Sequence, residues 1–525
     1  MKYNELERLF LERRISRRQF LAGAAALGAT TLAAGVIGKP AFAAPKKGGR
    51  LRVAIGHGST TDSLDPATYE NDHIISTNFT FNNHLGEVIE TGEIGPELAE
   101  NWETDDAKTW VINVRKGVEF HNGKEVTADD VIASFNHHRG ETKSPARSLL
   151  EQVDSIEKDG KYRVVFKLNA ANADFMYVAS DYHIAIQPDT GDGTIDATAG
   201  IGAGPYVIEH WEPGERAFLK RHPNYWKSDR AHFDEVEILS IIDASARTNA
   251  LITDEVDLID RVDLKTVNLL KQRPNAKVEE VVGFRHYTFP MRTDTAPFDD
   301  NNIRMALKLS LDREQVLNSV LRGHGRIGND NPISPSNRFH ADLEQRTYDP
   351  EKAKWHLKKA GAEGLKVDLS AADAAFPGAV DAAVLYKEHA ARAGITINVV
   401  REPDDGYWSD VWMNKPWCAC YWSGRATADW MFTTAYAADA DWNDTFWKHD
   451  RFNKLLKEAR AELDQEKRAE MYAEMQSIVR DDGGVVVPMF ANYVFATSKS
   501  VRHDGTLAGN WNLDGMKFAE RWWFA

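Results

Sequence analysis

The chain has 525 residues, of which 42% are hydrophobic and 27% charged, and its formal net charge is -15. An acidic surface repels nucleic acid and anionic membranes. The sequence has no concentrated basic patch to offset this repulsion, so we expect no nucleic-acid partner. The length suits two or three domains of ordinary size, and the hydrophobic fraction is ample for their cores.

The N-terminus has the order of segments found in exported proteins. Arg17 and Arg18 lie in a twin-arginine motif, a run of small and apolar residues follows over 21–37, and Ala41-Phe42-Ala43 matches the A-x-A cleavage pattern. The run falls short of the ~20 mostly apolar residues that a membrane span needs. We therefore predict a twin-arginine signal peptide over 1–43, cleaved near Ala43. The mature chain is expected in the periplasm, without a lipid anchor because no cysteine lies near the cleavage site.

The first part of the mature chain shows strand patterns. Alternating polar and apolar residues predict strands over 50–55, 110–115 and 162–168. Between the last two, a helix is expected to begin at Thr127. This residue can cap the free amide of Asp130, and acidic residues are stabilised at the positive end of a helix.

The clearest fold signal lies further along. Residues 365–369 have a strand pattern, the alanine-rich segment 378–393 is helical in composition and can end at Gly394, and 395–400 is a second strand pattern. A strand, a helix and a strand at this spacing predict a right-handed parallel crossover. The chain is therefore expected to be an α/β protein of more than one lobe.

Two longer helices and a strand flank this unit. Apolar residues at helical spacing predict one helix over 301–322 and another over 451–479, the second ended by Gly483. The valines of 485–487 then predict a buried strand.

The chain has two cysteines, Cys418 and Cys420. A disulfide across one intervening residue would be strained, and a zinc site needs more ligands at metal spacing. We interpret both cysteines as small buried core residues.

Several short strings together resemble one family. They are Pro96–Trp102, Val114–Gly123, Thr127–Phe135, Gly202–Tyr206, Asn224–Trp226, Pro297–Arg304 and Leu311–Arg313. Each string alone is weak, but their order and spacing are similar to those of the peptide/nickel-type substrate-binding proteins of ABC importers. The resemblance covers essentially the whole mature chain. It implies a two-lobe periplasmic binding protein fold of type II, which captures a small polar ligand between its lobes and delivers it to a membrane ABC permease.

The resemblance also implies a domain organisation. The first lobe would take 44–90, 200–285 and 490–525, an inserted subdomain would take 91–199, and the second lobe would take 286–489. The chain would cross between the lobes near 281–284 and 489–492, and the lobes would close on the ligand by hinge motion.

In relatives that bind peptides, a Trp and a following Asp frame the ligand, and the Asp pairs with its α-ammonium group. The matching stretch here keeps the aromatic as Trp422, followed by Ser423, but has Arg425 in place of the acid. A guanidinium would repel an ammonium group and bind a carboxylate, sulfonate or phosphate. Asp429, four residues further on, could instead serve a cationic group, or could pair with Arg425 in a purely structural role.

Other ligand-binding candidates follow from the same resemblance. Trp408 matches a second aromatic of the family's cleft, and Tyr69 and Glu70 match a loop of the first lobe that touches ligand in relatives. Phe490 and Asn492 lie where the chain is expected to cross back between the lobes. A core position for the tryptophans, or a solvated loop for Tyr69 and Glu70, is the plain alternative.

Two other functions remain open from the residues. A periplasmic hydrolase could use two cleft carboxylates, although the sequence has no G-x-S-x-G elbow, H-E-x-x-H helix or glycine-rich phosphate loop. A metal or haem carrier of the same fold would need clustered ligands, but the 17 histidines are scattered, and adjacent His137 and His138 diverge by ~100° on a helix. We expect a monomeric binding protein that is not an enzyme and carries no cofactor. Its ligand would be a peptide, an opine-like conjugate, an acidic oligosaccharide or another organic anion.

Overall fold

The computed structural model describes residues 45–525 except 404–406, 424 and 441. The predicted signal peptide, with its twin arginines and cleavage site, lies outside these residues. Residues 46–524 form one compact unit, and all that follows concerns this unit. In the part of the chain that is described, no helix combines the length and the apolar character that crossing a membrane requires.

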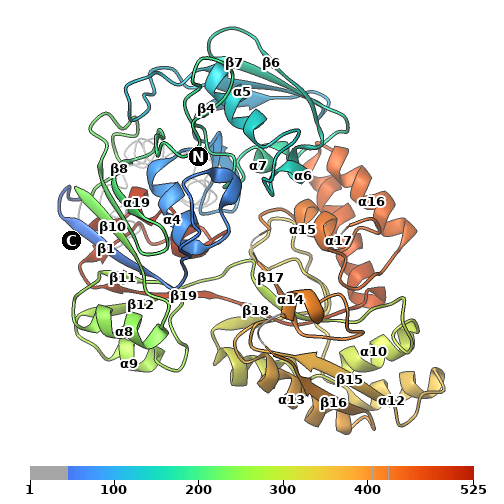
Figure 1. The fold of residues 1–525 in the computed structure, drawn as a ribbon. Coiled ribbons are helices and arrows are strands. Elements are labelled where there is room, and N and C mark those ends of the chain that lie inside the picture. The colour runs from blue at the N-terminus through green and yellow to red at the C-terminus, as the bar shows by residue number, and fades with distance from the viewer. Residues whose placement is uncertain (1–44, 404–406, 424, 441) are drawn as a thin grey trace, which may run out of the picture. The chain divides into compact units, whose positions relative to one another are not determined.

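The first lobe is built on a seven-stranded sheet (Figure 1). Its strands, in spatial order, are β12 (Ala276–Val281), β19 (Tyr493–Ser498), β11 (Leu258–Ile259), β1 (Arg50–Ile55), β10 (Glu235–Ser240), β9 (Arg216–Arg221) and β8 (Tyr206–Glu212). The helices of this lobe are α4 (Asp72–Phe81), α8 (Ala244–Ile252), α9 (Val267–Lys271), α18 (Asn512–Gly515) and α19 (Phe518–Arg521), with the short helix η1 (Pro66–Thr68). The first lobe also contains two strand pairs. They are β2 (Gly86–Val88) with β3 (Ile94–Pro96), and β20 (Val501–Arg502) with β21 (Trp523–Phe524).

The inserted subdomain has a sheet and a hydrophobic core of its own. The strand order is β4 (Ala99–Glu103), β5 (Thr109–Val114), β7 (Arg163–Leu168) and β6 (Val153–Lys158), and the helices are α5 (Ala128–His137), α6 (Arg147–Leu150) and α7 (Phe175–Val178). Helix α5 begins as predicted from Thr127. The backbone amide of Thr127 donates to the Asp130 carboxylate at 2.8 Å, in the reciprocal arrangement of a capping box.

The second lobe contains a four-stranded sheet and the predicted crossover unit. The sheet order is β14 (Gly325–Ile327), β18 (Val485–Ala491), β13 (His286–Pro290) and β17 (Cys420–Trp422). Strand β15 (Lys366–Ala371), helix α13 (Ala379–Ala391) and strand β16 (Thr396–Arg401) form the crossover, and β15 pairs with β16 in parallel, which confirms the prediction. The other helices are α10 (Asn301–Leu309), α11 (Arg313–Val316), η2 (Leu317–Leu321), α12 (Pro350–Lys359), α14 (Tyr407–Asp410), α15 (Ala428–Ala435), α16 (Asp450–Ala461) and α17 (Gln465–Asp482).

The two long helices predicted from apolar spacing are each broken. The first ends at Leu309, and a new helix begins after Asp312, whose carboxylate accepts from the amide of Gln315. The second breaks over 462–464, where Asp464 caps the start of α17. An aspartate that accepts from backbone amides favours a helix start over helix continuation, and this local signal outweighed the apolar spacing.

The chain passes between the two large sheets at two places. Strand β12 of the seven-stranded sheet is followed by β13 of the four-stranded sheet, and β18 runs on into β19 in the opposite direction (Figure 1). At the first crossing, a Cβ on Gly283 would lie 2.2 Å from the Tyr493 ring. Any larger residue at position 283 would therefore displace Tyr493 on the second crossing.

Candidate functional site

Strand β17 and the loops around it carry an aromatic cluster. The side chains of Trp408, Tyr421 and Trp442 are 41%, 39% and 49% exposed, which is unusual for rings of this size. Trp408 lies 5.5 Å from Tyr421 between ring centroids, and Trp442 lies 6.2 Å from the buried Trp422. Flat exposed rings offer a stacking surface at low entropic cost, as ligand sites require.

A buried carboxylate lies behind this cluster. Asp444 accepts a hydrogen bond from the Trp412 indole at 3.2 Å, and Trp412 in turn contacts both Trp408 and Trp422. Burial raises the pKa of Asp444 to about 6, and hydrogen bonds from Trp412 and Trp422 oppose the rise. Asp444 therefore fixes the orientation of the tryptophans from their buried side.

Arg425 lies just beyond β17, and Ser423 contributes a backbone contact to it. The Arg425 Nη1 donates to the Ser423 carbonyl at 3.1 Å, and the guanidinium lies 5.5 Å from the centre of the Trp430 ring. Its Nε is buried without a hydrogen-bond partner, and no carboxylate among the described residues lies within ion-pair distance of it. Burial lowers the pKa of Arg425, while Tyr182 and Asp181 partly offset the effect.

Asp429, the alternative charged anchor, is already engaged. It is buried on α15 and forms an ion pair with Arg460 at 3.1 Å. The structural pair between Asp429 and Arg425 is absent from the ion pairs of the described residues. Arg425 is therefore the more available of the two charges, although the ligand role of either remains a prediction.

The side chains opposite Arg425 come from the inserted subdomain and the first lobe. A cavity of about 40 Å³ is lined by Tyr182, Asp181 and Trp511 from that side and by Ala426 and Trp430 from the second lobe. This volume has room for a water molecule or two, whereas organic ligands occupy pockets of about 300–1,000 Å³. A solute can therefore enter here only if the lobes separate.

A second group of charges lies near Tyr421. Arg261 donates to Asp72 at 2.7 Å and to His57 at 2.8 Å, and burial together with Arg261 lowers the pKa of His57. Arg285 lies on the first crossing segment, 5.2 Å from the Tyr493 ring centre. The sequence analysis missed Arg261, Arg285, Tyr182 and Tyr421. The available signal was the position of Arg285 directly after the first expected crossing and of Tyr421 next to Trp422, whereas the sequence offered no such signal for Arg261 and Tyr182.

The remaining predicted residues occupy different places. Tyr69 is fully buried, and its hydroxyl donates to the Leu64 carbonyl at 2.8 Å, so its ring packs in the first-lobe core in this structure, whereas Glu70 is exposed. Phe490 is buried in β18. Asn492, between β18 and β19, donates to Glu280 at 2.6 Å, which ties the two crossing segments together.

A buried ion-pair cluster, here called the latch, joins the inserted subdomain to the second lobe. Asp174 accepts from Arg468 at 2.7 and 3.0 Å and from Arg338 at 2.7 Å. Beside it, the Ala173 amide donates to the Arg460 carbonyl at 2.7 Å. The side chains of Asp174 and Arg468 are 3% and 1% exposed, so this pair is as buried as a hydrophobic core, whereas Arg338 is 28% exposed.

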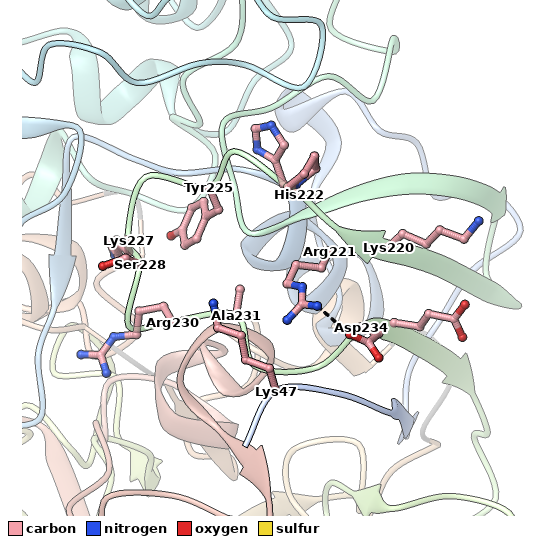
Figure 2. Close-up of a pocket in the computed structure, with 12 residues that line it drawn as sticks. Lys47, Lys220, Arg221, His222, Tyr225, Lys227, Ser228, Arg230, Ala231 and Asp234 are labelled. Atoms are coloured by element: carbon pink, nitrogen blue, oxygen red, sulfur yellow. Dashed lines mark hydrogen bonds and ion pairs between the residues drawn. The ribbon is translucent and has the colours of Figure 1, made fainter. Parts of the chain in front are cut away.

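Another cavity, of about 550 Å³, lies elsewhere (Figure 2). It is on the first lobe and is lined by basic residues that include Lys220, Arg221 and Lys227. Its charges are mostly neutralised, since Arg221 pairs with Asp234 at 2.6 Å and Lys227 with Glu520 at 2.7 Å. We therefore place the candidate site at Arg425, where a charge lacks a partner.

A carboxylate group formed by Glu87, Glu97 and Glu520 has the spacing of a metal site. Two ammonium groups already occupy it, however. Lys227 lies 3.1 Å from Glu87, and Lys517 lies 2.5 Å from Glu97. These lysines provide the counter-charge that a metal ion would provide.

Both cysteines are buried and free, as interpreted from the sequence.

Comparison with known proteins decides the family. Residues 93–444 match the family described as bacterial extracellular solute-binding proteins, family 5 middle region. The chain belongs to this family. It is also 26% identical over 444 residues to di/tripeptide-binding protein 1 of Pseudomonas aeruginosa, covering 78% of this chain and 82% of the relative.

Solved structures support the family fold. The periplasmic binding protein DppA of Helicobacter pylori, in complex with the peptide STSA, superposes with a TM-score of 0.74 at 23% identity, covering 91% of this chain and 99% of that one. AgaA of A. tumefaciens R10, in complex with agropinic acid, gives 0.75 at 23% identity with the same coverage. This family member therefore has the two-lobe, type II periplasmic binding protein fold expected from the sequence.

Proposed function

We propose that this chain is exported to the periplasm and, as a monomer, captures a small anionic organic solute between its lobes for delivery to a membrane ABC permease. The peptide-binding relatives support import as the process and peptides as the starting ligand class. The observation that carries the anionic assignment is Arg425. Its side chain is half-buried, its Nε is buried without a hydrogen-bond partner, and no carboxylate of the described part of the chain pairs with it, beside exposed aromatic rings. A ligand carboxylate would supply the missing counter-charge.

A binding role and a catalytic role are separated by one experiment. Purified protein is incubated with di- and tripeptides, opine-like sugar–amino acid conjugates and acidic oligosaccharides, and its melting temperature is measured. A true ligand stabilises the folded state by about 2.7 kcal/mol at a concentration of 100 Kd. Chromatography should then recover that ligand unchanged. Conversion of the ligand to product would instead support the hydrolase alternative.

Export by the twin-arginine route makes a separate prediction. Replacing Arg17 and Arg18 together with lysine keeps the positive charge but removes the pair that the export receptor reads. We expect uncleaved precursor to accumulate in the cytoplasm, detected by fractionation and immunoblotting. Lysine replacement of Arg13 and Arg14, which lie outside the motif, is the matched control. Normal mature protein in the periplasm of the Arg17/Arg18 variant would contradict this route.

A further inference from the structure

The junction of the two lobes contains a second arginine with unmet charge. Arg285 lies between β12 and β13, its Nε is buried without a partner, and among the described residues it takes part in no ion pair. Its guanidinium packs over the Tyr493 ring at 5.2 Å. Arg285 therefore resembles Arg425, in that each is a guanidinium held near protein surface without a carboxylate of its own.

The neighbours of Arg285 do not neutralise it. Asp72 is taken up by Arg261, with oxygen–nitrogen distances of 2.7 and 2.9 Å. Asp260 lies 3.7 Å from Arg261 and 3.6 Å from Arg247. Three guanidiniums thus share two carboxylates, and the group retains a positive charge.

Both arginines lie at one end of the β13–β17 pairing, because Arg285 immediately precedes His286, which pairs with Trp422, and Arg425 follows Trp422 by three positions. Tyr421 and Trp422 are successive residues of this strand, so their side chains point to opposite faces. Tyr421 lies opposite Tyr287, two residues from Arg285, and electrostatic coupling links both tyrosines to Arg261. Trp422 lies opposite His286, and burial lowers the pKa of His286 to about 4, with a further contribution from the positive charge of Arg425. Tyr421 also affects the pKa of Arg425, so both unpaired cations lie around β17, where the exposed rings of Tyr421 and Trp408 are 5.5 Å apart.

We infer that the solute carries two separate anionic groups, one bound by Arg425 and the other by Arg285, with its middle against the aromatic rings. This inference rests on the proposed function and narrows its ligand class to dicarboxylates, such as acidic dipeptides or conjugates with two acid groups. Without such a solute, both guanidiniums would lack a counter-charge from the described residues, and their partial desolvation would not be offset.

Matched dipeptides test the inference. Calorimetry compares Ala-Glu with Ala-Gln and Ala-Asp with Ala-Asn, pairs that differ by one negative charge at nearly equal size. We expect the acidic member of each pair to bind about 10- to 100-fold more tightly, because hydrogen bonds to a charged group contribute a gain of this size. Arg285→Gln should remove this difference, and Arg285→Lys should restore part of it. Arg425→Gln should weaken both members of each pair.

The control is Arg451→Gln, which makes the same charge change at an exposed ion pair with Glu474 and should alter no affinity. Melting curves of every variant confirm folding. Equal binding of acid and amide, tighter binding of the amides, or no binding by any of the four peptides would overturn the dianion assignment. If the amides bind as tightly as the acids, the proposed import function stands and only the dianion fails. If no solute of any class tested binds, the proposed function fails as well.

Discussion

Replacing Arg425 with alanine is expected to weaken ligand binding by about 2–5 kcal/mol, mostly through faster release, because the anionic group of the ligand loses its partner. Arg425→Lys should recover only part of the loss, since an ammonium group cannot reproduce the planar two-pronged contact. The free energy of unfolding without ligand should change little, because in the described structure Arg425 holds only a backbone carbonyl and an aromatic face.

Calorimetry and chemical denaturation on the same variant separate the two roles of Arg425. Lost affinity at unchanged stability supports an anchor for an anion. Lost stability at unchanged affinity contradicts it and assigns Arg425 a structural role. Asp429 would then be the remaining charged candidate, although a ligand cation would first have to displace Arg460 from it.

Removing Asp174 from the latch is expected to have the largest effect on stability. Asp174→Asn leaves the buried Arg468 without its counter-charge, and breaking such pairs costs about 3–5 kcal/mol. Because the latch joins the inserted subdomain to the second lobe, the ligand-free variant should also have a larger radius of gyration. Denaturant titration and small-angle scattering measure the two effects.

The exposed pair of Arg451 and Glu474 is the matched control for the latch. It has the same two-pronged geometry, with both contacts at 2.8 Å, but lies on the surface, where ion pairs contribute little. Arg451→Gln should therefore leave stability and scattering unchanged. If Asp174→Asn behaves like this control, the latch does not hold the subdomain to the lobe.

The sequence predicted those elements whose signal is local. The crossover of β15, α13 and β16 follows from periodicity and length, and the start of α5 follows from Thr127 and Asp130. The two broken helices show that the helix-start signal of an aspartate can be missed within a longer apolar pattern. Asp312 and Asp464 are ordinary helix-start residues that were hidden inside longer apolar patterns.

The candidate site was predicted only in part, because it is assembled from distant segments. Resemblance to the family pointed to Trp408, Trp422 and Arg425. Arg285 and Tyr182 lie 140 and 243 positions away from Arg425 in the numbering, and only the fold places Tyr182 near Arg425 and Arg285 at the same end of the β13–β17 pairing. The sequence also could not show that Arg425 has no carboxylate partner among the described residues. Asp429 was an equally plausible partner, but the structure pairs it with Arg460.

The central claim is that a solute is captured between lobes that open and close. Small-angle scattering of the mature protein tests this claim most directly. The protein is first stripped of ligand by gentle denaturation and refolding. It is then saturated with a solute whose binding has been confirmed by calorimetry. The cavity between Tyr182 and Trp430 is about 40 Å³ in the described structure, so a solute can enter there only if the lobes open. We expect the radius of gyration to fall when the ligand is added. An unchanged scattering curve at confirmed saturation would contradict capture between the lobes.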